Sequence, residues 1–250
     1  MKTRIIFTLT TGRSGTALLA KLLEPLPQVH AEHEPKPLFS DAFVYLKTRP
    51  GFDVDKFCHD KINAIKTIIL ESNRSIYIET CHTFGKGFIE PMCRLLSSEV
   101  EIIILHRDPM DVAMSMYRLG DIPGRTKTGI HWYISPTDFL SLTHLTRPMT
   151  DYTDFQLCYW YTQEMLCRMN HALRHHQILA TIEFRELLSY HYFHNILKRM
   201  KLEIPRNYHA YYKSITLTKI NEKTHRKHPL SLPVDYQEQI DQVHQDLIIK

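Results

Sequence analysis

The chain has 250 residues, 43% of them hydrophobic and 23% charged, which is the composition of an ordinary globular protein. Its formal net charge of +4 is too small, and its basic residues too scattered, for a nucleic-acid-binding protein. Five dispersed cysteines form no CxxC pair and no short-spaced Cys/His motif, so we expect reduced thiols and no metal site. Sixteen histidines are an unusual number, and we expect most of them on the surface.

The N-terminal stretch MKTRIIFTLTTGR places Lys2 and Arg4 before an apolar run, as a signal peptide does. Gly12 and Arg13 interrupt that run too early for a signal peptide. No apolar stretch in the sequence is long enough to cross a bilayer. We therefore expect a cytoplasmic protein without a membrane span.

Strand-like runs rich in isoleucine, valine and threonine alternate with helix-like stretches along the chain. The predicted strands are 4–10, 29–33, 75–81, 100–106 and 178–182. The predicted helices are 15–24, 54–71, 85–97, 109–119, 152–173 and 236–248. This order predicts one α/β domain over residues 1–250, with helices covering both faces of a central parallel sheet.

Residues 120–150 interrupt the alternation, because they carry glycines, prolines and no steady apolar period. A loop of this length inside a compact domain is usually functional or mobile. We interpret it as a lid or acceptor-binding insertion, with a disordered surface loop as the alternative. Its Trp132 and Tyr133 are candidates to stack on a sugar or an aromatic acceptor, with ordinary loop packing as the alternative.

The stretch TTGRSGTALLAKLL joins the first predicted strand to the first predicted helix. Gly12 and Gly15 let the backbone approach a ligand closely, and the N–H groups and dipole of the helix N-terminus favour an anion. Ser14 and Thr16 add hydroxyl donors, and Arg13 adds a permanent cation. The stretch therefore predicts a phosphate-binding loop, with a tight structural turn as the alternative. It is not a Walker A loop, which requires GxxxxGK[ST].

A second motif, EVEIIILHRDPMDVAMSMYRLG, predicts a buried strand ending at His106 and then a helix. Asp108 is the expected N-cap of that helix and Pro109 its first residue. Arg107 therefore lies at the carboxyl end of a sheet strand, where open α/β folds bind ligands. Ser115 follows two helical turns later, and a guanidinium with a hydroxyl predicts a second phosphate site. A surface arginine paired with a nearby aspartate is the alternative.

Together the motifs GRSGT and RDPMDVAMSMYR, each between a strand and a helix, resemble those of the sulfotransferase family over about 40 residues. The resemblance implies a P-loop-like three-layer sandwich and 3′-phosphoadenosine 5′-phosphosulfate (PAPS) as sulfuryl donor, without a metal. It implies that the first loop, with Gly12, Gly15 and Thr16, cradles the 5′-phosphate of the donor. It also implies that Arg107 and Ser115 hold the 3′-phosphate.

Two features depart from the family pattern. Ala17 stands where the family often has a second threonine, so one hydroxyl contact to phosphate is missing. The basic, glycine-containing loop late in the family is only loosely matched by KINEKTHRKH. Its candidate donor contacts are Lys219, Arg226 and Lys227, with a solvated basic face as the alternative.

Sulfuryl transfer to a hydroxyl needs a base near the acceptor oxygen and cations near the leaving phosphate. The second predicted strand runs into VHAEHEPKP, where alternation places Glu32 and Glu34 on one face and His33 on the other. The resemblance to carbohydrate- and tyrosylprotein-type sulfotransferases implies a catalytic glutamate at Glu34. A surface glutamate at the end of a strand is the alternative.

His82, in YIETCHTFGKG, is the rival base, because the cytosolic small-molecule sulfotransferases carry a catalytic histidine after the corresponding strand. A hydrogen-bonded histidine of the pocket or core is the alternative. Glu79 and His82 are also candidates to line the acceptor pocket. We expect Cys81 to be a packed thiol.

The sequence thus predicts a PAPS-dependent sulfotransferase whose acceptor is a carbohydrate or another small hydroxyl compound. Arg13 and Ser14 would stabilise charge on the bridging oxygen, and Glu34 would accept the proton of the acceptor. One alternative is a P-loop-type small-molecule kinase, against which the missing GK[ST] counts. The other is a non-catalytic nucleotide-binding protein of the same fold.

Overall fold

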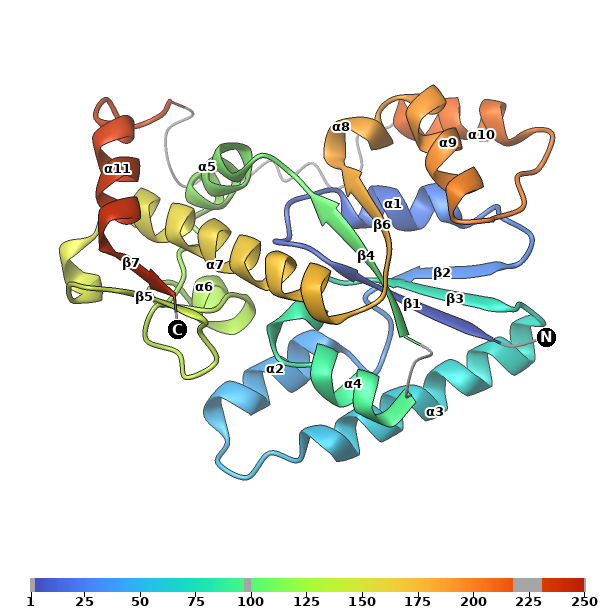
Figure 1. The fold of residues 1–250 in the computed structure, drawn as a ribbon, viewed down its shortest axis with the longest axis horizontal. Helices are drawn as coiled ribbons and strands as arrows, with labels where there is room; N and C mark the ends of the chain where they lie inside the picture. Colours follow the sequence, from blue (N-terminus) through green and yellow to red (C-terminus); the bar gives the residue numbers. More distant parts are fainter. Residues whose placement is uncertain (1–2, 97–99, 218–230, 250) are drawn as a thin grey trace.

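A five-stranded parallel sheet forms the centre of the computed structural model, which describes residues 3–96, 100–217 and 231–249 (Figure 1). All four strand pairings in this sheet are parallel. The strands, in the spatial order β2-β3-β1-β4-β6, are β2 (Val29–His33), β3 (Ile76–Thr80), β1 (Arg4–Leu9), β4 (Val100–His106) and β6 (Ile178–Glu183). The predicted α/β fold with a central parallel sheet is therefore confirmed.

The strands are apolar on both faces because helices cover both sides of the sheet. In β1, Ile5 and Phe7 belong to one hydrophobic cluster, whereas Ile6 between them belongs to the other. Ile102 and Ile103 in β4 divide in the same way. Alternate side chains of each strand thus enter two separate hydrophobic cores, one on each face of the sheet. The sheet and the two helical layers that cover it are the predicted three layers.

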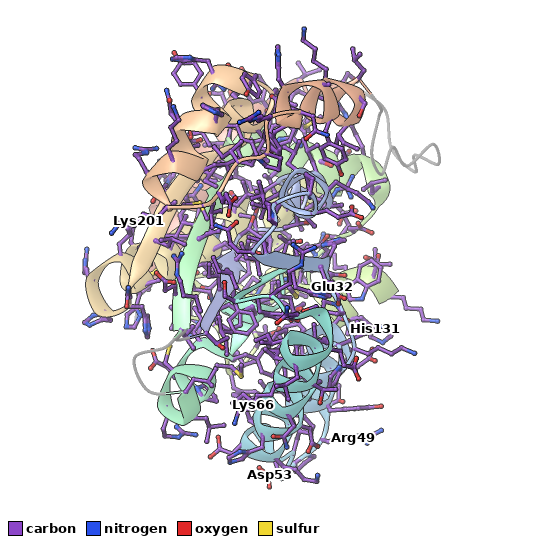
Figure 2. The ribbon with its side chains drawn as sticks, turned by 90° about the vertical axis from the view of Figure 1, so that its right-hand side faces the viewer. Glu32, Arg49, Asp53, Lys66, His131 and Lys201 are labelled. Atoms are coloured by element: carbon purple, nitrogen blue, oxygen red, sulfur yellow. The ribbon has the colours of Figure 1, made fainter. Side chains whose placement is uncertain are left out.

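The two helical layers draw on different parts of the chain (Figure 1). One cluster packs the sheet against α2 (Phe39–Thr48), α3 (Val54–Ser72), α4 (Ile89–Leu96), α5 (Pro109–Leu119), α7 (Asp154–His175) and α11 (Tyr236–Asp246). The other packs it against α1 (Thr16–Leu23), α8 (Phe184–Leu187), α9 (Tyr190–Arg199) and α10 (Tyr208–Thr216). Arg49, Lys66 and Lys201 point outward at the surface (Figure 2). Among the described helices, none combines the length and the apolar character that a membrane crossing requires.

Some predicted elements differ from the observed ones. The predicted helix 85–97 is a 3-10 turn, η1 (Phe84–Lys86), followed by the shorter helix α4. The last predicted helix ends at Asp246, and the chain continues as β7 (Leu247–Ile249). Leu247 therefore does not belong to the buried helical stripe, because it pairs with Leu145 in a small antiparallel sheet.

Residues 120–150 are more regular than the sequence predicts. They contain α6 (Lys127–Trp132), β5 (Thr143–Leu145), which pairs with β7, and the start of η3 (Met149–Asp151). Lys47 of α2 fixes this segment, because its Nζ donates to the carbonyls of Ile130 (3.0 Å) and Tyr133 (2.9 Å) and lies 2.7 Å from the carboxylate of Asp138. The disordered surface loop is therefore wrong, whereas a role as lid stays a prediction.

The strand order places the ends of β1 and β4 at a topological switch point. From β1 the chain runs to the edge strand β2, returns through β3, and then crosses to β4 on the far side of β1. In open α/β sheets, ligands bind outside the carboxyl ends of the strands at such a point. The segments after Leu9 and after His106 both begin there.

Candidate functional site

The loop between β1 and α1 has a backbone shaped for an anion. Gly12, Arg13 and Gly15 have positive φ angles of 81°, 56° and 89°. Left-handed residues in a loop turn successive backbone N–H groups toward one concavity, which binds anions. Gly15 is the N-cap of α1 and has no side chain to bond the N–H groups of the first turn.

Both glycines of this loop also permit close packing within the protein. A Cβ at Gly12 would lie 3.2 Å from the ring of His82, and a Cβ at Gly15 would lie 2.7 Å from the ring of Phe184. Their absent side chains therefore let His82 and Phe184 approach the loop. The glycines thus assemble the site as well as leaving room for a ligand.

The buried hydroxyls of the loop bond to the loop itself. Oγ1 of Thr11 lies 2.6 Å from Oγ of Ser14, which donates to the carbonyl of Gly12 (2.9 Å). The hydroxyl of Tyr161 in α7 donates to the carbonyl of Thr11 (2.6 Å). These bonds hold the loop from inside. For Ser14 to contact a donor, its hydroxyl must turn away from this network, so that contact stays a prediction.

The two predicted phosphate motifs meet in the structure. Nη1 of Arg107 donates to the carbonyl of Arg13 (2.8 Å), and Nε of Arg13 donates to Oγ of Ser115 (3.1 Å). Ser115 therefore contacts Arg13, where the sequence analysis paired it with Arg107. Asp108 caps α5 as predicted, with its carboxylate accepting from the N–H groups of Met110 and Asp111.

Arg107 keeps donor capacity toward the crevice. Its guanidinium stacks over the ring of Phe184 at 4.8 Å. Its Nε is buried without a hydrogen bond, and the closest approach to the carboxylate of Asp111 is 3.6 Å. A half-buried guanidinium whose Nε makes no hydrogen bond suits an anionic ligand, while its long ion pair with Asp111 matches the alternative predicted from the sequence.

Glu34 is the first residue after β2, and the chain changes direction there. Its φ of 52° is left-handed, and its N–H donates to the carbonyl of Thr80 (3.3 Å). The expectation that alternation places it on one strand face with Glu32 is wrong, because β2 ends at His33. Glu32 bonds instead to Nε2 of His30 (2.7 Å).

His82 lies between Glu34 and a buried lysine that the sequence analysis missed. Its Nε2 is 3.7 Å from Oε1 of Glu34, and its Nδ1 is 2.8 Å from Nζ of Lys86. Nζ of Lys86 also donates to the carbonyl of Trp132. Lys86 follows His82 by four residues, and η1 brings its side chain back toward the imidazole.

Lys86 is completely buried, in an aromatic enclosure. Its Nζ lies over the rings of Tyr133 (4.8 Å) and Tyr161 (5.2 Å). Burial lowers the pKa of Lys86 well below its usual value, and the negative charge of Glu34 opposes this only in part. The ring faces and the Trp132 carbonyl compensate the buried amine.

Tyr133 is 3% exposed and packs edge-to-face against Tyr161 at 4.9 Å. The prediction that Tyr133 stacks on an acceptor is therefore wrong, because its ring lies inside the protein. Trp132 is 36% exposed, and its stacking role stays a prediction. The candidate donor contacts Lys219, Arg226 and Lys227 lie outside the described residues.

Glu79 does not line a pocket, contrary to the sequence analysis. It is fully buried, pairs with Nζ of Lys61 at 2.8 Å, and accepts a hydrogen bond from the hydroxyl of Tyr77 (2.9 Å). Burial raises the pKa of Glu79, whereas Lys61 opposes that rise. Nζ of Lys61 also donates to the carbonyls of Pro35 and Pro37, each at 2.9 Å. This buried pair thus anchors the segment that follows Glu34.

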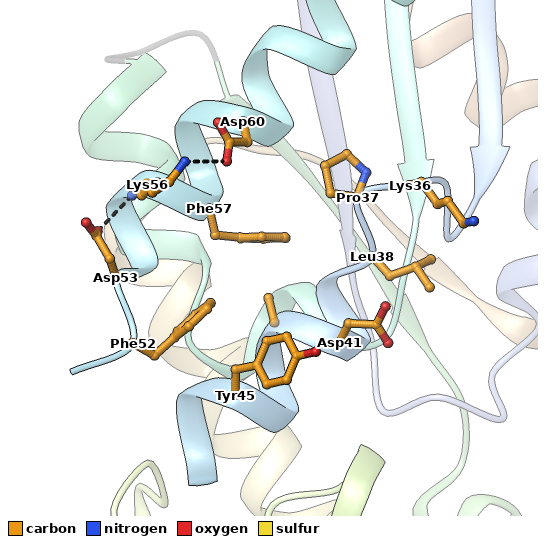
Figure 3. Close-up of a pocket in the computed structure, with 11 residues that line it drawn as sticks. Lys36, Pro37, Leu38, Asp41, Tyr45, Phe52, Asp53, Lys56, Phe57 and Asp60 are labelled. Atoms are coloured by element: carbon orange, nitrogen blue, oxygen red, sulfur yellow. Dashed lines mark hydrogen bonds and ion pairs between the residues drawn. The ribbon is translucent and has the colours of Figure 1, made fainter. Parts of the chain in front are cut away.

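A cavity of about 470 Å³ opens between α2 and α3, and the same segment forms one of its walls (Figure 3). Its size is that of a small-molecule site. The rings of Tyr45, Phe52 and Phe57 and the side chain of Leu38 supply apolar walls. Charged side chains complete the lining, namely Lys36, Asp41, Asp53, Lys56 and Asp60.

Comparisons with known proteins give the fold. No protein-family model matches the sequence, and no curated protein does. The sulfotransferase STF9 from Mycobacterium avium is similar in structure, with a TM-score of 0.54 and 12% identity, over 86% of this chain and 68% of that one. The sulfotransferase domain of the curacin biosynthetic pathway matches with a TM-score of 0.48 and 10% identity, over 83% of this chain and 77% of that one.

The sulfotransferase domain of the Synechococcus PCC 7002 olefin synthase matches with a TM-score of 0.48 and 12% identity, over 98% of this chain and 95% of that one. At 12% identity, the similarity to STF9 shows a shared fold. The chain has the α/β fold of STF9.

Proposed function

We propose that this chain is a sulfotransferase that transfers a sulfuryl group from PAPS to a hydroxyl of a carbohydrate or another small compound. One observation carries the proposal. Arg13, Arg107 and Ser115 are joined by hydrogen bonds at the carboxyl ends of β1 and β4. The shared fold with STF9 supports the same reaction class.

The donor fits the residues that are present. The left-handed loop at Gly12, Arg13 and Gly15 suits a phosphate, and the unused Nε of Arg107 suits a second one. When bound, PAPS supplies the sulfuryl group. In our proposal the loop and Thr16 hold its 5′-phosphate, while Arg107 and Ser115 select its 3′-phosphate.

The surroundings of His82 favour Glu34 as the base. Nζ of Lys86 lies 2.8 Å from Nδ1 of His82. In our proposal the lysine donates this hydrogen bond, so that the neutral imidazole carries its proton on Nε2, which faces Glu34. A protonated Nε2 is a donor and takes no further proton. The carboxylate of Glu34 keeps its acceptor capacity, and the imidazole orients it.

In this mechanism the acceptor hydroxyl gives its proton to Glu34 while its oxygen bonds to sulfur. The bond between sulfur and the bridging oxygen breaks, and Arg13 stabilises the charge that develops on that oxygen. Ser14 joins it only if its hydroxyl leaves the carbonyl of Gly12. The products are the sulfated acceptor and 3′-phosphoadenosine 5′-phosphate.

The acceptor is proposed from the cavity between α2 and α3. Lys36 and Pro37, which follow Glu34 closely in the chain, form part of its wall. Tyr45, Phe52 and Phe57 suit the apolar face of a sugar ring or another small apolar body. The odd number and dispersed positions of the five cysteines are the sequence features behind our proposal of a reducing, cytoplasmic compartment.

Ligand-induced stabilisation tests the donor assignment. We expect 3′-phosphoadenosine 5′-phosphate to raise the Tm clearly, because it binds only the folded state, and AMP or ATP to raise it little. A labelled-donor screen against pooled carbohydrates and phenols then identifies the acceptor. Equal shifts with all three nucleotides would favour a kinase, and binding without turnover in the full screen would favour a non-catalytic protein.

A further inference from the structure

Three metal-ligating side chains meet where α4 lies against the end of α7. They are Glu90, His171 and His176, and one ligand atom from each lies within 4.8 Å of the other two. Nε2 of His176 is 3.0 Å from Oε1 of Glu90. Glu90 and His171 are exposed, so both can be reached from solvent.

The local sequence HALRHH builds this cluster. His171 and His175 are one helical turn apart on α7, with ring centroids at 4.4 Å. His176 ends the helix in an extended conformation, and its N–H donates to the carbonyl of Ala172 (2.9 Å). Its ring therefore turns back toward α4, where Glu90 occupies the first turn.

His176 is held in place before any ion binds. Its side chain is 10% exposed, and its Nδ1 lies 3.7 Å from Sγ of Cys93. The thiol of Cys93 therefore supports the ring from behind. Nε2 of His176 is thereby directed toward Glu90.

We propose that Glu90, His171 and His176 bind a divalent transition-metal ion of the zinc class. Two imidazole nitrogens and one carboxylate oxygen are a zinc ligand set, with solvent completing the tetrahedron. Metal–ligand bonds of about 2.0 Å place tetrahedral ligand atoms about 3.3 Å apart. Glu90 and His176 are already close to that separation, so the exposed ring of His171 makes most of the movement.

The site is remote from the proposed reaction. Gln177 follows His176, and its carbonyl accepts the N–H of Ile102 (3.0 Å) near the start of β6. The donor loops lie at the carboxyl ends of the same parallel strands, across the sheet. The ion therefore links α4 to the end of α7 and stabilises the native state by binding to it.

Titration of the tag-free protein with Zn²⁺ tests the site. We expect one-to-one binding by calorimetry, a visible Co²⁺ spectrum that Zn²⁺ abolishes, and a higher Tm with Zn²⁺ but not with Mg²⁺. Binding should weaken by about tenfold or more at pH 5.5, because protons compete for the imidazoles. Absence of saturable Zn²⁺ binding would overturn the proposal.

Variants locate the ion. His171→Ala changes an exposed side chain, so the fold should persist while Zn²⁺ affinity falls about tenfold or more. Glu90→Gln should weaken binding as well. His59→Ala removes an exposed histidine of α3 outside the cluster and should leave binding unchanged. Equal affinity in His171→Ala and the wild type would refute the site, whatever the response to 3′-phosphoadenosine 5′-phosphate.

Discussion

The donor side and the acceptor side of the candidate active site are built in different ways. On the donor side, Arg107 and Arg13 bond to a backbone carbonyl and a hydroxyl, and both remain partly exposed. On the acceptor side, Glu34 lies 3.7 Å from His82, and His82 in turn contacts the completely buried Lys86. The donor side thus holds permanent cations ready for phosphate, whereas the acceptor side uses buried groups to orient one carboxylate.

If the proposed function holds, this difference makes affinity for the donor and the rate of turnover separable by mutation. Removing a cation from the donor side should weaken binding, because charge-assisted contacts to phosphate are lost. Removing the carboxylate from the acceptor side should slow the chemistry and leave the donor bound. Variants on each side can therefore test whether donor affinity and turnover depend on different residues.

The largest effect is expected for Glu34→Gln. The amide keeps the size of the side chain but cannot accept the proton, so turnover should fall by on the order of 10²–10⁴. Affinity for 3′-phosphoadenosine 5′-phosphate should stay near that of the wild type. Glu32→Gln is the matched control, because Glu32 bonds to His30 and should leave turnover unchanged. Wild-type turnover in Glu34→Gln would remove Glu34 as the base.

Arg107→Ala should weaken donor binding, in contrast to Glu34→Gln. Loss of a charge-assisted contact costs about 1.5–3 kcal/mol, which is about 10- to 150-fold in affinity for 3′-phosphoadenosine 5′-phosphate. The preference for this nucleotide over AMP should shrink by the same factor in calorimetric titrations. Arg94→Ala, which removes an exposed arginine paired with Asp55, is the control. A preserved preference in Arg107→Ala would place the 3′-phosphate elsewhere.

The fold could be predicted from the sequence because its signals are local. All five strands of the sheet coincide with predicted apolar runs, and the motifs GRSGT and RDPMDVAMS, which meet in the structure, each follow one of them. The acceptor side could not be predicted in the same way. In the sequence, nothing distinguishes Lys86 from a surface lysine, because its burial depends on residues of α7 such as Tyr161. In the same way, Lys61 and Glu79 are paired only by the tertiary packing. Likewise, the strand alternation failed at Glu34, where a single left-handed residue redirects the chain.

The cluster that we propose as a metal site was not predicted, for the same reason. The sequence search looked for short Cys/His spacings, whereas Glu90 and His176 are 86 residues apart. The pattern HALRHH was the available signal, since histidines one helical turn apart share a face.

His82→Asn should have a smaller effect than Glu34→Gln. Asparagine retains polar contacts near Glu34 and removes the imidazole that orients it, so we expect kcat/KM for the acceptor to fall by about tenfold. The loss should appear mainly in KM for the acceptor, measured by steady-state kinetics. If His82→Asn is inactive while Glu34→Gln turns over normally, the base is His82.

Two buried lysines, Lys61 and Lys86, should differ in how much their removal lowers the free energy of unfolding. Lys61 is paired with Glu79, so Lys61→Met leaves a buried carboxylate without its cation and should cost about 3–5 kcal/mol of unfolding free energy. Lys86 has no carboxylate within ion-pair distance among the described residues, and burial lowers its pKa. Lys86→Met should therefore be much less destabilising at pH 7, as measured by urea denaturation.

The pH dependence of this last difference has a definite sign. Burial makes the pKa of Lys86 lower in the folded protein than its ordinary value of 10.5, so the unfolded chain binds the proton more tightly. The wild type therefore gains stability relative to Lys86→Met as pH rises from the folded pKa toward 10.5, where the unfolded lysine also loses its proton. Denaturation of both proteins at pH 7 and pH 10 measures the change, with other titrating groups cancelling in the difference. If the wild type instead loses stability relative to Lys86→Met at pH 10, the enclosure stabilises the ammonium ion. Lys86 would then donate to Nδ1 of His82 as a charged group.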